Sequence, residues 1–111
     1  MTSAARKSAI SDYKERKASA GIYAISCLAT GQVWVGRAPD TGAIANRVWF
    51  MLRQNASTHR SLQEAWNQQG AEAFTLEIVE VLDPDLTPYA RQDALKTRLG
   101  HWAGMLGATA I

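Results

Sequence analysis

The sequence has one cysteine and no long hydrophobic run. Because Cys27 is alone, neither an intrachain disulfide nor a cysteine cluster can form. No apolar stretch reaches about 18 residues, and the start of the chain lacks the hydrophobic core of a signal peptide. We therefore expect a soluble protein of the reducing cytoplasm, without membrane association.

The net charge is also small. A value of +2 does not by itself indicate nucleic-acid binding, but the charge is unevenly distributed. Residues 1–20 contain five basic and two acidic side chains, a balance of +3, which leaves −1 for the remainder. This segment is predicted to be a basic helical arm, either in contact with phosphates or simply a solvated helix face.

The length of 111 residues predicts one compact domain. After the expected helix of residues 8–20, two runs rich in β-forming residues, 21–28 and 33–36, predict an antiparallel hairpin with Gly31 in its turn. Residues 37–42 contain proline and glycine and predict a loop.

Helical periodicity returns in residues 43–54, and a second helix is expected after the polar residues 55–57, with Ser57 or Thr58 as its cap and Gly70 at its end. Residues 73–82 alternate between apolar and polar side chains, as in a strand.

The last predicted helix begins with Thr87 and Pro88 and runs to about Met105, with Gly107 after it. Its expected buried stripe is Ala94, Leu95, Trp102 and Leu106. The order of elements predicts an α+β fold: a small three-stranded antiparallel sheet flanked by helices, with an extra N-terminal helix.

The motif Gly21-Ile22-Tyr23 is followed, at hairpin spacing, by Trp34-Val35-Gly36. Arg47 then lies on the next helix, residues 62–70 read LQEAWNQQG, and Trp102 lies in the last helix. In this order, residues 21–102 resemble the GIY-YIG endonuclease superfamily. The resemblance implies a GIY-YIG-like nuclease domain over residues 21–111, DNA as the partner, and a divalent metal, Mg2+ or Mn2+.

The resemblance also implies roles for individual residues. Tyr23 would assist the attacking water, and Arg47 would neutralise a phosphate, for which a planar guanidinium is well suited. The structural alternatives are that Tyr23 is a core aromatic and that Arg47 is a solvated helix residue. Gly36 and Arg37 are predicted to lie at the substrate-binding surface.

Two departures from the family pattern concern chemistry. Trp34 replaces a tyrosine, and an indole cannot transfer a proton like a phenol; it could stack on a base or serve only in packing. The metal-binding glutamate is expected three residues before Trp102, where this chain has Leu99. Glu64, Glu77 and Glu80 are possible substitutes, and the metal ligand stays unknown.

Two further polar residues are candidates. His59 could act as an acid, a phosphate contact or a metal ligand, or could only precede the helix. Asn67 could touch a phosphate or order a turn. The functional hypotheses are therefore a metal-dependent DNA endonuclease, a catalytically degenerate DNA-binding or protein-interaction module, and an oligomer formed through tryptophan-rich surface.

Overall fold

The computed structural model describes residues 19–111. The predicted helical arm of residues 1–20 lies outside this part, apart from Ser19 and Ala20. Within the described residues, no helix is both long enough and apolar enough to cross a membrane.

A four-stranded sheet forms the middle of the molecule. Its strands are β1 (Gly21–Cys27), β2 (Val33–Ala38), β3 (Phe74–Val81) and β4 (Thr109–Ala110), arranged in the order β3-β1-β2-β4. β1 pairs antiparallel with both β2 and β3, whereas β4 pairs parallel with β2. The sequence predicted three antiparallel strands. The sheet has a fourth strand, the two-residue β4, and its parallel pairing with β2 makes the sheet mixed.

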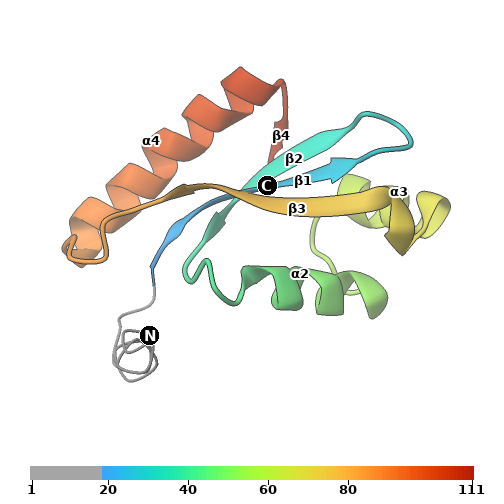
Figure 1. Cartoon of the computed structure of the whole chain (residues 1–111), viewed down its shortest axis with the longest axis horizontal. Helices are drawn as coiled ribbons and strands as arrows, with labels where there is room; N and C mark the ends of the chain where they lie inside the picture. Colours follow the sequence, from blue (N-terminus) through green and yellow to red (C-terminus); the bar gives the residue numbers. More distant parts are fainter. Residues whose placement is uncertain (1–18) are drawn as a thin grey trace, which may run out of the picture.

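Helices cover both faces of the sheet. The elements α2 (Ile44–Arg53) and α3 (Arg60–Gln69) lie on one side, and α4 (Pro88–Leu106) lies on the other (Figure 1). A short 3-10 helix, η1 (Ala71–Ala73), precedes β3. The α+β fold class predicted from the sequence is thus confirmed.

The alternation of side chains along β1 produces two cores. Tyr23, Ile25 and Cys27 face the side of α2 and α3, whereas Ile22 and Ala24 face α4. All five are buried. β1 is therefore an inner strand with apolar side chains on both faces, paired with β2 on one side and with β3 on the other.

The structure confirms the predicted cap and end of the last helix, and the glycine in the turn between β1 and β2. Thr87 caps α4 by accepting a hydrogen bond from the Ala90 N–H at 3.2 Å, and Gly107 ends the helix in the left-handed region. Gly31 has a positive φ of 81° in the hairpin turn.

Three local predictions were wrong. β2 continues through Arg37 to Ala38, because the strand remains paired with β1. The N-cap of α3 is His59 and not Ser57 or Thr58. The hydroxyl oxygen of Ser57 accepts a hydrogen bond from the backbone N–H of His59. Leu106 is 40% exposed, whereas Leu99 packs against the core below α4.

Candidate functional site

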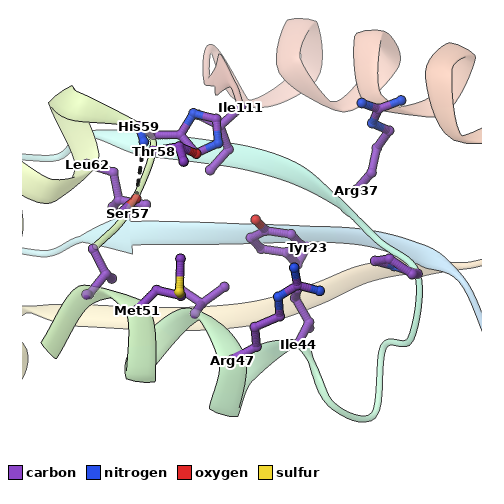
Figure 2. Close-up of a pocket in the computed structure, with 13 residues that line it drawn as sticks. Tyr23, Arg37, Ile44, Arg47, Met51, Ser57, Thr58, His59, Leu62 and Ile111 are labelled. Carbon is purple, nitrogen blue, oxygen red and sulfur yellow. Dashed lines mark hydrogen bonds between the residues drawn. The ribbon is translucent and has the colours of Figure 1, made fainter. Parts of the chain in front are cut away.

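A pocket of about 280 Å³ opens between the sheet and α2. Its walls come from β1, β2, α2 and the segment before α3 (Figure 2). The polar and charged residues that line it are Tyr23, Arg37, Arg47, Ser57, Thr58 and His59. None of the described residues that line this pocket carries a carboxylate side chain. The pocket therefore presents donors and positive charge, the properties that suit an anion.

Tyr23 occupies the pocket because Gly36 leaves room for it. The two residues are cross-strand partners in β1 and β2, and a methyl group on Gly36 would lie 2.5 Å from the Tyr23 hydroxyl oxygen. Real Cβ atoms essentially never come so close, so a methyl group at Gly36 would displace the phenol ring, which lies directly over the backbone of Gly36. The second glycine of the motif is thus explained by the space that Tyr23 needs.

Arg47 faces the same pocket from α2 (Figure 2). Burial raises the pKa of the Tyr23 phenol, and the Arg47 guanidinium acts in the opposite direction without cancelling the shift. Tyr23 is therefore a protonated phenol at neutral pH, able to donate and to accept a hydrogen bond. No described residue makes a hydrogen bond with the Tyr23 hydroxyl group. Likewise, no described residue forms an ion pair with Arg47.

Arg37 and His59 lie at opposite ends of the pocket. The Arg37 side chain extends from β2 toward α4 in Figure 2, and it also lines a second cavity with Gln92 and Leu95. His59 precedes α3, and its backbone N–H donates a hydrogen bond to Ser57 Oγ at 3.2 Å. Both side chains reach the pocket, but Arg37 is directed away from Tyr23.

Trp34 is not part of the pocket surface. Its side chain is 1% exposed, its ring packs near Phe74 at 6.2 Å between centroids, and its Nε1 donates to Ser61 Oγ at 2.9 Å. An indole in this position cannot stack on a bound base without unfolding the core. The structure therefore supports a packing role for Trp34 rather than stacking on a base.

Asn67 belongs to a network that fixes the segment before α3. Gln63 is buried; its Nε2 donates to the Leu52 carbonyl at 3.1 Å and to Asn67 Oδ1 at 3.1 Å, and its Oε1 accepts the Ser57 N–H at 3.0 Å. Asn67 in turn donates to Asn55 Oδ1. No sequence pattern predicted this role of Gln63, because a glutamine in an amphipathic helix is usually solvated.

Comparison with solved structures gives two strong matches. The catalytic domain of the homing endonuclease I-TevI is 25% identical, with a TM-score of 0.68 over 83% of this chain and 97% of that one. A mutant of the catalytic domain of the intron endonuclease I-TevI is also 25% identical, with a TM-score of 0.67 over 80% and 84%. The chain has the GIY-YIG endonuclease fold. No protein-family model and no curated protein sequence matches it.

The divalent metal implied by the GIY-YIG fold does not fit the described residues. No group of three histidine, cysteine, aspartate or glutamate side chains among residues 19–111 converges on one point. Magnesium is usually bound by one or two carboxylates, and no described side chain that lines the pocket is a carboxylate. Leu99, at the position expected for the metal-binding glutamate, packs on the α4 side of the sheet, opposite Tyr23.

The three glutamates considered as substitutes also lie elsewhere. Glu80 Oε1 accepts hydrogen bonds from Arg98 Nε and Trp102 Nε1, both at 2.7 Å, and is thereby tied to α4. Glu77 lines a cavity beside Trp102, and Glu64 is exposed on α3. None of them lines the pocket of Tyr23 and Arg47. The GIY-YIG scaffold is retained here with the arginine and the first tyrosine, but no carboxylate side chain of residues 19–111 lines the pocket that they share; Asp40 lies beside Arg47 only in a smaller neighbouring cavity.

Proposed function

We propose that this chain binds the phosphodiester backbone of DNA in the pocket between the sheet and α2, as a GIY-YIG-fold module that does not depend on a metal. The observation that carries the proposal is that the Tyr23 phenol and the Arg47 guanidinium line one pocket that no carboxylate side chain of the described residues enters. The likeness to an endonuclease catalytic domain supports DNA as the source of the phosphate.

Arg47 is the principal phosphate contact in this proposal. Its side chain is exposed, it makes no ion pair with any described residue, and its planar fork can donate two parallel hydrogen bonds to phosphate oxygens. Tyr23, protonated because burial raises its pKa, supplies a neutral donor from the floor of the pocket. Arg37 and His59 extend the positive and hydrogen-bonding surface to either side.

A second candidate is hydrolysis of the bound phosphodiester, which the resemblance implies. The position of Tyr23 beside Arg47 favours it, since a phenol near a cation can assist a proton transfer. The missing carboxylate weighs against a metal-assisted route through this pocket. Phosphate binding requires only the residues that are present, so it is the function we propose.

Binding is tested with labelled duplex, branched and single-stranded DNA, measured by fluorescence anisotropy with Mg2+, with Mn2+ and with a chelator. We expect binding that requires no metal, with an affinity in chelator at least as high as with Mg2+ or Mn2+, which compete for the phosphates, and intact DNA after incubation. Arg47→Ala should weaken binding about tenfold or more, because a charged hydrogen bond is lost. Lys96→Ala removes the same charge from exposed surface of α4, across the sheet, and should have little effect.

Two results would decide against the proposal. If the wild-type protein binds none of these DNAs at low salt, the pocket is not a phosphate site. If the protein cleaves DNA with metal, and Tyr23→Phe abolishes cleavage without lowering the stability of the fold, the endonuclease hypothesis replaces the binding module.

A further inference from the structure

The outward face of α2 is cationic and has an aromatic ring at its centre. Four residues of this ten-residue helix are exposed, namely Asn46, Arg47, Phe50 and Arg53, and none of the ten is acidic. At 3.6 residues per turn, the four fall in one sector of about 120° around the helix axis. The buried or half-buried residues occupy the remainder, toward the sheet and α3.

Phe50 is not needed by the core. It is 56% exposed, whereas its neighbour Trp49 points inward and stacks on Trp66 with ring centroids 5.6 Å apart. An exposed phenylalanine between two arginines combines a flat apolar surface with positive charge. Proteins that hold single-stranded nucleic acid use this combination, because aromatic rings stack on bases while cations bind the backbone.

This face is continuous with the proposed phosphate pocket. Arg47 lines the pocket and also belongs to the exposed sector, so a strand bound at Arg47 can continue along α2. Arg53 lies six residues further on, about 9 Å along the helix axis, a separation that lets the two guanidinium groups bind different phosphates. Phe50 lies between them.

Resting on the proposed function, we infer that α2 binds DNA at an unpaired base: Arg47 and Arg53 hold phosphates on either side, and the Phe50 ring stacks on the base between them. The face of a base is accessible to such a ring only when the base has left its stack, as in single-stranded or locally melted DNA. A second copy of this chain is a poorer occupant, since Arg47 and Arg53 would face like charges across the interface.

The test compares the affinities for a single-stranded oligonucleotide and for the matching duplex. Phe50→Ala should weaken single-strand binding about 5- to 140-fold, the range for losing one stacked base, and should change duplex binding much less. Phe50→Trp should retain single-strand binding, because it keeps a stacking surface. Tyr89→Ala is the matched control, since Tyr89 is 83% exposed on α4.

The failure of this inference differs from the failure of the proposed function. If Arg47→Ala weakens DNA binding but Phe50→Ala leaves single-strand affinity unchanged, or weakens both DNAs equally, stacking at an unpaired base is wrong and the phosphate pocket stands. If neither DNA binds the wild type, both proposals fail. A dimer in sedimentation that Phe50→Ala dissociates would make a second copy the occupant and overturn the inference.

Discussion

The ring of Tyr23 lies against the backbone of Gly36, its partner on the neighbouring strand, with no space for a methyl group between them. This contact joins the two motifs of the hairpin into one structural unit. The first motif supplies a phenol in the pocket, and the glycine of the second lets that phenol lie flat on the sheet. The position of the hydroxyl group therefore depends on Gly36 as much as on Tyr23.

Gly36→Ala should lower the free energy of unfolding by about 1–3 kcal/mol, because the added methyl group overpacks a buried ring. Denaturant unfolding measures the change. Gly104→Ala is the control, since a methyl group at Gly104 in α4 would meet no atom within 4 Å and should leave stability equal or higher. Equal effects of the two substitutions would show that Tyr23 does not occupy the space above Gly36.

The pKa of the Tyr23 phenol should lie above the ordinary value for a tyrosine. Burial raises its pKa, and Arg47 acts in the opposite direction. Ultraviolet absorbance during alkaline titration, comparing wild type with Tyr23→Phe, isolates its contribution. Because the folded pKa is raised, this group adds stability that is complete below the unfolded pKa and is lost as the pH rises toward the folded value.

Arg47→Ala should move the Tyr23 titration to still higher pH, since the substitution removes the positive charge that favours the phenolate. The same absorbance titration detects the shift, with Lys96→Ala as a control for the loss of a charge elsewhere. A Tyr23 titration that does not respond to Arg47→Ala would place the guanidinium outside the electrostatic reach of the phenol.

Glu80→Gln should reduce the acid sensitivity of the fold. The hydrogen bond from Trp102 Nε1, together with Arg98, lowers the pKa of Glu80 against an opposing effect of burial. A lowered pKa contributes stability that is present above the unfolded pKa and is lost as the pH falls through the folded pKa. Unfolding free energies measured across that acidic range should therefore depend less on pH in Glu80→Gln than in the wild type.

Gln63→Leu should loosen the segment that carries Ser57, Thr58 and His59. The substitution leaves the Ser57 N–H without its partner, at a cost of about 1–3 kcal/mol, whereas the Leu52 carbonyl keeps its hydrogen bond from the Asn55 N–H. Hydrogen exchange at the Ser57 amide should accelerate more than the loss of global stability explains. Gln68→Leu, exposed on the same helix, is the control, and matching exchange rates in the two variants would remove the positioning role from Gln63.

The strong periodicities of the sequence predicted most of the fold. The β-forming residues of β1 indicated a strand, and the turn glycine and the cap of α4 follow from local chemistry. The strand β4 could not be predicted, because two residues carry no pattern and its partner Trp34 lies 75 positions away from Thr109. Leu106 was misplaced because the end of α4 extends beyond the core that Leu99 covers.

The candidate site was predicted in part, through a resemblance rather than through physics alone. Tyr23 and Arg47 were expected together, and the structure places both in one pocket, while their roles stay predictions. Trp34 could not be assigned from the sequence, because an indole is satisfied either in a core or against a base. Its burial and its hydrogen bond to Ser61 depend on α3 lying beside β2, an arrangement that the local sequence does not specify.

The salt dependence of DNA affinity in Arg47→Ala tests the phosphate pocket most directly. Each phosphate contact contributes a slope of about −0.9 to the logarithm of the binding constant against the logarithm of salt concentration for duplex DNA. We expect Arg47→Ala to lower the magnitude of the slope by about one contact and to weaken binding similarly for every duplex sequence. A slope identical to that of the wild type would contradict phosphate binding by Arg47.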